Sequence, residues 1–454
     1  MARLEKLSPE THCSEKTPAP ECPVTSVGQL PLEQVQNPLT GGCGLAVIVL
    51  CIVGLIAFHD HQPGFIAILW PWRWLLIPIA VFLTMFAVEI FVLGTHRRHF
   101  DYSHPRAMDA TAIRRIGERY SAFCFCLLGM TCFFVIWDRF VPHFIDFFWL
   151  SLPALIVLPI FFFWMAERYG RASGPVDEFL VFGHALTQLN LAMFGRAPLG
   201  KALAALKDPH IYSLLRGVAI KCYFIPIMLL SCLAYWYFFE NELMQAIRSM
   251  SVHLSWALAM QSTLKCLVTL ALAIDVTFAI IGYTCSMRLT DSQFTSTEPT
   301  LLGWAVALVC YPPFAIVFHT YVWSKVMLTW PEQMFLNHPV LSTIISVVIL
   351  ILTAIYSWST VSFGLRFSNL SNRGIICHGP YAWIRHPAYT CKNIAWWLAL
   401  IPSLAQHPLT AVGLLGINVI YGLRAWTEER HLMRTPHYRE YCQKVRSRCI
   451  PGIY

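Results

Sequence analysis

The chain has 454 residues, of which 56% are hydrophobic and 13% charged, and its mean hydropathy is +0.55. A soluble core of this size cannot hide so much apolar surface, so the composition excludes a soluble globular protein and indicates an integral membrane protein. The formal net charge of +8 does not indicate nucleic-acid binding, because Lys and Arg concentrate in loops between apolar runs, at 97–119, 168–221 and 424–448. The positive-inside rule predicts that these segments are cytoplasmic.

The first 43 residues are polar and rich in proline, as in Thr17–Pro23, and lack the charged, apolar and small-residue order of a signal peptide. We expect them to form a disordered cytoplasmic tail. The 16 cysteines fall mostly inside apolar runs without paired CxxC spacing. They predict packing of small side chains and no metal site.

Long apolar runs dominate the rest of the chain. They cover roughly residues 44–58, 74–93, 121–137, 147–165, 222–239, 266–287, 301–319, 339–358, 393–405 and 409–423. Because a membrane-spanning helix needs about 20 apolar residues, these runs predict about ten transmembrane helices. Continuous apolar runs lack the alternating pattern of a membrane barrel, so the predicted fold is an all-α, polytopic membrane protein.

The chain is expected to have two transmembrane parts. Residues 44–290 form an N-terminal transmembrane block of about six helices, interrupted by a polar connector at 168–220 with short surface helices. Residues 291–454 form a second membrane domain, which carries the motifs described below. Near the boundary, Ser296 or Thr297 is predicted to cap a helix that begins with Pro299 in its first turn.

Two acidic residues, Glu89 and Asp275, lie inside apolar runs. Acids within the membrane are energetically costly, so both are candidates for a functional site. The alternative is that each is a hydrogen-bonded acid facing a neighbouring helix. The sequence leaves both interpretations open.

The stretch from Gly379 to Tyr389 lies between apolar runs and reads GPYAWIRHPAY. Gly379-Pro380 predicts a tight turn, and Pro387 favours an extended conformation at His386. Such a loop offers hydrogen-bond donors to a carboxylate and aromatic faces to an adenine or a sulfonium. Anchoring of lipid headgroups is the alternative role for this loop.

A helix is predicted to continue from Asn418 through Leu432. Its spacing places four polar or aromatic residues on one face, Tyr421, Arg424, Glu428 and His431, with Glu429 about 100° around the helix. The preceding helical hairpin brings this helix end back to the same membrane surface as the 379–389 loop. The two elements can therefore line one pocket. The alternative is an ordinary surface ion pair between Arg424 and Glu428. The basic, aromatic tail after Pro436 is expected to fold over that pocket or to lie against anionic headgroups.

These motifs resemble the C-terminal signature of the isoprenylcysteine carboxyl methyltransferase family, whose wider relatives include bacterial phospholipid N-methyltransferases. The matching residues are Gly379-Pro380-Tyr381, Arg385-His386-Pro387-x-Tyr389, Arg424-x-x-Thr427-Glu428-Glu429, Tyr438-x-x-Tyr441 and Arg448-x-x-Pro451. The resemblance covers roughly the last 100 residues.

The resemblance implies a membrane methyltransferase that uses S-adenosylmethionine in a cytoplasm-facing pocket closed by the C-terminal segment. The acceptor is then a lipid-like or membrane-partitioned molecule with a carboxylate, thiol or amine. The implied catalytic residues are Arg424, which places the acceptor, and Glu428, which with His431 is a candidate to take a proton from an amine. Either Glu428 or Glu429 binds the cofactor's ammonium group. The implied cofactor-binding residues are Gly379, Tyr381, Arg385, His386, Pro387, Tyr389, Glu428 and Glu429.

Two other classes remain open. Membrane sterol reductases end in a similar hairpin and basic tail and use NADPH, and a non-catalytic transporter or scaffold would place Asp275 and Glu89 along a path. The methyltransferase interpretation requires His386 and Glu428 to lie around one cleft. A structure that places them on opposite membrane faces would exclude it.

Overall fold

The computed structural model describes residues 37–60, 70–138, 144–171, 176–251, 256–315, 338–406 and 409–452. Most of the predicted N-terminal tail, residues 1–36, lies outside the described residues. The first helix begins at Leu39, so the last residues of the predicted tail belong to a helix.

Nine long helices form the framework of the described part. They are α1 (Leu39–Phe58), α3 (Arg73–Ala87), α4 (Ala110–Trp137), α5 (Phe144–Tyr169), α8 (Pro209–Ser251), α9 (Trp256–Thr284), α13 (Pro339–Phe363), α14 (Pro387–Gln406) and α15 (Leu409–Leu432). A π-helix, η3 (Val88–Val92), extends α3. The remaining helices are η2 (Trp70–Trp72), η4 (Thr95–Arg98), α6 (Glu178–Met193), α7 (Leu199–Ala205), η5 (Arg288–Thr290), α10 (Leu301–Leu308), η7 (Gly364–Arg366), η8 (Gly379–Ala382) and α16 (Pro436–Lys444).

Eight of the helices in the described ranges are long and apolar enough to cross a membrane: α1, α3 with η3, α4, α5, α8, α9, α13 and α15. The prediction of an all-α, multi-pass membrane protein is confirmed. Two of the ten predicted runs give different elements. The run at 301–319 forms only the short helix α10 before turns at 310–315, and its last residues lie outside the described ranges. The run at 393–405 belongs to α14, which has 20 residues but is not among the eight.

The predicted cap at Ser296 or Thr297 is wrong. Thr300 caps α10, because its side chain accepts a hydrogen bond from the Gly303 amide at 3.2 Å. Ser296 and Thr297 instead form strand β1 (Ser296–Thr297), which pairs antiparallel with β2 (Ser371–Asn372). A partner about 75 residues later in the chain satisfies these backbone groups, and no local pattern reveals such a partner.

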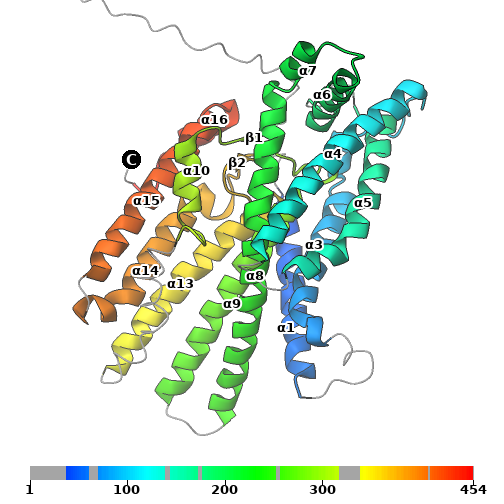
Figure 1. The fold of residues 1–454 in the computed structure, drawn as a ribbon. Helices are drawn as coiled ribbons and strands as arrows, with labels where there is room; N and C mark the ends of the chain where they lie inside the picture. The colour runs from blue at the N-terminus through cyan, green and yellow to red at the C-terminus, as the bar shows by residue number, and fades with distance from the viewer. Residues whose placement is uncertain are drawn as a thin grey trace, which may run out of the picture.

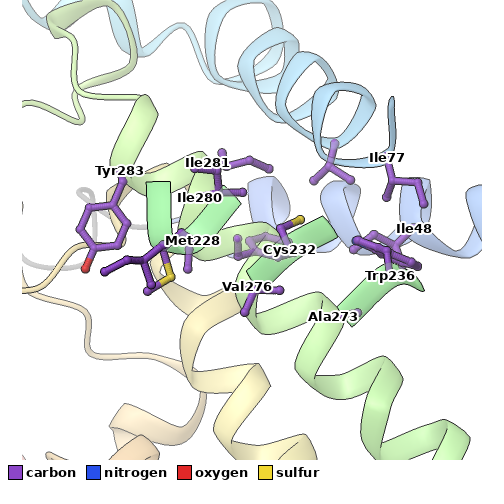
Figure 2. Close-up of a cluster of buried hydrophobic side chains, with 14 of the residues drawn as sticks. Ile48, Ile77, Met228, Cys232, Trp236, Ala273, Val276, Ile280, Ile281 and Tyr283 are labelled. Atoms are coloured by element: carbon purple, nitrogen blue, oxygen red, sulfur yellow. The ribbon is translucent and has the colours of Figure 1, made fainter. Parts of the chain in front are cut away.

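The main core lies where the N-terminal helices meet. Figure 2 shows buried side chains of this cluster, among them Ile48, Ile77, Trp236 and Ile280, from α1, α3, α8 and α9. Gly44 allows α1 to approach closely, since a Cβ at this position would lie 2.9 Å from the ring of Phe278. Close backbone approach at small residues is a usual source of helix association in membranes.

Helix α9 connects the two halves of the molecule, because it packs against α8 on one side and α13 on the other (Figure 1). Helix α13 packs in turn on α14, and α14 on α15. The start of α14 and the end of α15 lie at the same end of the molecule as α16, β1 and β2, the upper end in Figure 1. The hairpin therefore returns the 379–389 loop and the charged end of α15 to one side, as predicted.

Both intramembrane acids join two helices. Asp275 on α9 accepts hydrogen bonds from the hydroxyl groups of Tyr356 and Thr360 on α13. Glu89, in the π-helix η3, accepts a hydrogen bond from Thr40 Oγ1 of α1 at 2.7 Å. Asp275 thus has the arrangement of a hydrogen-bonded acid facing a neighbouring helix. Glu89 also lines a cavity between the start of α1 and the end of α13.

Candidate active site

The loop that begins the site has the predicted turn. Gly379 has φ +62°, a left-handed conformation, and a Cβ there would lie 2.6 Å from Ser362 Oγ. The turn continues as the 3₁₀-helix η8, and Pro387 occupies the first position of α14. His386 therefore directly precedes α14. It lies between η8, which contains Pro380, and α14, which begins with Pro387.

The buried carboxylate of Glu429 organises the loop. Its Oε1 accepts a hydrogen bond from His386 Nε2 at 3.1 Å and forms an ion pair with Arg385 Nη1 at 3.1 Å, and its Oε2 lies 3.1 Å from Arg448 Nη2. The Glu429 side chain is 5% exposed. Charge-assisted hydrogen bonds of this kind are among the strong ones in proteins. Of the two acids predicted to bind an ammonium group, Glu429 is thus already surrounded by three basic side chains.

Glu428 has a different environment. Its side chain is exposed, and its Oε2 accepts a hydrogen bond from Tyr389 Oη at 2.9 Å. The Tyr389 ring stacks on the His386 imidazole, with ring centroids 5.5 Å apart and planes within 7°. His386 and Glu428 therefore lie on one side of the molecule, with Tyr389 between them. The arrangement on opposite faces, which would have excluded a methyltransferase, does not occur.

Arg424 is buried among aromatic rings. Its guanidinium carbon lies 5.1 Å from the ring centroid of Tyr389, 5.2 Å from Tyr421 and 5.9 Å from Tyr311. Its Nη2 donates to Asn369 Oδ1 at 3.1 Å. The alternative of a surface ion pair with Glu428 is wrong, because the planar cation is satisfied by aromatic faces and an amide oxygen inside the protein.

The C-terminal segment covers the loop. The carbonyl oxygens of Ser447 and Arg448 accept from the amides of Arg385 and His386 at 3.0 and 2.9 Å. Tyr441 Oη donates to the carbonyl oxygen of Tyr381 at 2.7 Å. Burial, and then the nearby charge of Glu428, raise the pKa of the Tyr381 phenol well above its usual value. The tail thus folds over the site, the first of the two predicted arrangements.

Sequence reasoning missed the partners of His431. The imidazole Nε2 lies 3.0 Å from Ser296 Oγ, and its Nδ1 lies 3.6 Å from Glu298 Oε2. Glu298 in turn accepts from Arg430 Nη2 at 3.0 Å. In the sequence, the position of Glu298 beside Pro299 is a signal for this acid but does not indicate His431 as its partner. These contacts bring β1 to the charged end of α15.

A small cavity lies at the centre of these groups. Its lining includes Tyr389, Arg424, Glu428, His431 and Glu298. Its volume is about 40 Å³, enough for a few water molecules at most. Within the described residues, no group of three or more His, Cys, Asp or Glu side chains is arranged to hold a metal ion.

Residues 334–434 match the sequence profile of the isoprenylcysteine carboxyl methyltransferase (ICMT) family. The C-terminal part of the chain is thus similar to the ICMT-family domain. The match contains the 379–389 loop, α14 and α15, and therefore His386, Tyr389, Arg424, Glu428 and Glu429. It does not extend to the N-terminal block or to the covering segment at 441–449. No curated protein and no solved structure matches the chain.

Proposed function

We propose that this protein transfers a methyl group from S-adenosylmethionine to a lipid-like or membrane-partitioned acceptor. The single observation that carries the proposal is that the ICMT-family motif residues meet in space, with Tyr389 stacked on His386 and hydrogen-bonded to Glu428. The roles of the individual residues below are part of the proposal.

The side chains of the site fit the charged groups of the cofactor. S-adenosylmethionine supplies a methyl group already activated on a positively charged sulfonium. The exposed carboxylate of Glu428 suits the ammonium group, and the faces of Tyr389 and Tyr421, which already surround the Arg424 cation, suit positive charge. A cavity of about 40 Å³ is too small for the cofactor, so binding requires the elements that line it to separate.

The chain's own residues then have four tasks: to bind, to orient, to exclude water and, for some acceptors, to take a proton. Alignment of the acceptor with the methyl group and exclusion of water supply most of the rate. Arg424 is placed to bind an oxyanion of the acceptor, in exchange for its contact with Asn369. A carboxylate or thiolate acceptor needs no base, whereas an amine must lose a proton, for which Glu428 and His431 are the candidates.

We place the site on the cytoplasmic side. The support is the positive-inside rule: the basic segment 424–448 includes the end of α15 and all of α16, next to the 379–389 loop. Acceptors that partition into the membrane reach such a site from the inner leaflet.

Calorimetric binding of S-adenosylmethionine to the detergent-purified protein tests the proposal. His386→Ala and Glu428→Ala are measured with it, and NADPH is titrated as a competing ligand. His104→Ala and Glu440→Ala are matched controls, since both side chains are exposed ion-pair members outside the site. The expected result is micromolar binding that is lost in the two site variants and kept in the controls.

Two results would overturn the proposal. One is the absence of S-adenosylmethionine binding by the parent protein. The other is binding of NADPH in its place, which would indicate that the domain shares the architecture of the family without its chemistry.

A further inference from the structure

A large cavity lies between the N-terminal block and the ICMT-family domain. Its volume is about 540 Å³, within the range of small-molecule sites, whereas the cavity around Arg424 measures about 40 Å³. One wall consists of the start of α1, η3 and η4. The other consists of the end of α13, η7 and residues 376 and 378. Neither part of the chain forms this cavity alone.

The cavity shares a wall with the loop of the candidate active site. Trp358 and Ser362 line it, and both touch the position where a Gly379 side chain would lie. The Trp358 ring also packs edge-on against Trp383, with ring centroids 5.9 Å apart. Phe363 lines the cavity and packs against Tyr381, at 5.3 Å between centroids. A molecule in the cavity is therefore one layer of side chains away from the 379–383 turn.

The polar part of the lining places two arginines beside one acid. Its charged side chains are Arg98, Arg366 and Glu89. Behind the two guanidinium groups, Asp291 Oδ2 holds Arg98 Nη1 at 2.8 Å and Arg366 Nη2 at 3.0 Å. Burial alone would raise the pKa of Asp291, but the hydrogen bond from His99, together with the charges and hydrogen bonds of these basic groups, lowers it to about 2. Asp291 thus stays ionised and keeps both arginines in place.

The chemistry of the lining indicates which kind of molecule fits the cavity. Guanidinium groups bind carboxylates and phosphates through paired hydrogen bonds. Glu89, held by Thr40, can accept from an N–H or O–H group beside that oxyanion. Apolar residues continue the cavity along the helices, among them Leu45 on α1 and Val361 on α13. Polar groups near the helix ends and apolar groups further in match an amphiphile at a membrane boundary.

We propose that this cavity binds the acidic head and the first part of the chain of a membrane amphiphile. This binding does not depend on the function proposed above. The N-terminal block then contributes to ligand binding, because α1, η3 and η4 supply one wall of the site. Glu89, an intramembrane acid outside the candidate active site, would contact the bound amphiphile.

Photolabelling in phosphatidylcholine nanodiscs tests the binding. The probes are a fatty acid and a lysophosphatidate with a diazirine on the chain, compared with a monoacylglycerol of the same chain, which has a neutral head. We expect each acidic probe that binds to label peptides spanning 39–45 or 358–366 about tenfold more than the neutral probe, the difference that one charge-assisted hydrogen bond makes. The acidic probe that labels more strongly, the fatty acid or the lysophosphatidate, identifies the preferred oxyanion as carboxylate or phosphate.

Two variants, each with a matched control, locate the site. Leu45→Trp fills the cavity, and its control Leu50→Trp lies on the same helix at a side chain that is 70% exposed. Arg98→Gln removes one guanidinium, and its control Arg97→Gln changes the adjacent exposed arginine. We expect Leu45→Trp to abolish labelling and Arg98→Gln to remove the preference for acidic heads, while both controls label like the parent.

Equal labelling by acidic and neutral probes, or labelling unchanged in Leu45→Trp, would overturn the inference. Calorimetry with S-adenosylmethionine is run on every variant and reports separately on the proposed function. Cavity variants that keep cofactor binding while losing the amphiphile support the inference. A parent that binds the amphiphile but no S-adenosylmethionine overturns the proposed function and leaves this inference standing.

Discussion

Substitution of Glu429 by Gln tests whether this carboxylate holds the active-site loop on α15. The change removes one negative charge from a contact with Arg385, His386 and Arg448. The Arg385 and His386 side chains are 8% and 5% exposed, so they lose their counter-charge in a buried setting. Arg448 is 55% exposed and contributes little.

The expected cost follows from this burial. Removal of one partner from a buried ion pair costs about 3–5 kcal/mol, and Gln keeps one acceptor oxygen, so we expect a value near the lower end, about 3 kcal/mol. Because this energy holds the loop on α15, local opening of the loop becomes about a hundredfold more frequent. The Arg385 and His386 amides report on it, because they belong to this loop and are protected in the closed state by hydrogen bonds to the carbonyl oxygens of Ser447 and Arg448.

Hydrogen exchange measured by mass spectrometry on the peptide containing Arg385 and His386 is the assay. The control is Glu440→Gln, which removes an exposed ion pair with Lys444 on α16 and is expected to change the exchange rate less than about threefold. Equal exchange in Glu429→Gln and the parent would refute the reasoning. So would an acceleration of the same size in Glu440→Gln.

Three further substitutions have defined outcomes. Asp291 has a folded pKa of about 2 against 3.8 for the free group, so it contributes about 2 kcal/mol of stability above pH 4 that is lost as the pH falls from about 4 to 2. Asp291→Asn should lower the free energy of unfolding at pH 7 and reduce this loss in acid. Gly379→Ala should destabilise by about 1–2 kcal/mol because of its positive φ and its contact with Ser362, whereas Gly422→Ala, in open space on α15, should be neutral or stabilising. Asp275→Ala should cost at least about 2 kcal/mol, because two buried hydroxyl donors lose their acceptor.

Each of these is measured by equilibrium unfolding in mixed detergent micelles. If the free energy of unfolding of Asp291→Asn falls in acid as much as that of the parent, the role of the Asp291 carboxylate is contradicted. Equal effects at Gly379 and Gly422 would show that the turn is not restricted to glycine. For Asp275, unchanged stability of the Ala variant would favour a functional role over the structural one.

The sequence by itself determined the features that depend on near neighbours. Continuous apolar runs are enough to predict spanning helices, because each helix satisfies its backbone within its own segment. Gly379, Pro380 and Pro387 restrict the backbone wherever they occur, so the turn and the start of α14 follow from local chemistry. The helix through Leu432 likewise follows from spacing. The order of these motifs also indicated the ICMT family.

Only the tertiary structure decided which groups meet. Arg424 turns to Asn369 and three tyrosines, Ser296 pairs with a segment near residue 372, and His431 meets Ser296 and not a helix neighbour. The cavity between α1 and α13 has no sequence signal at all, since its two walls lie more than 250 residues apart in the chain. Such contacts arise from the packing of distant helices, and a local pattern carries no record of the side chains on the facing element.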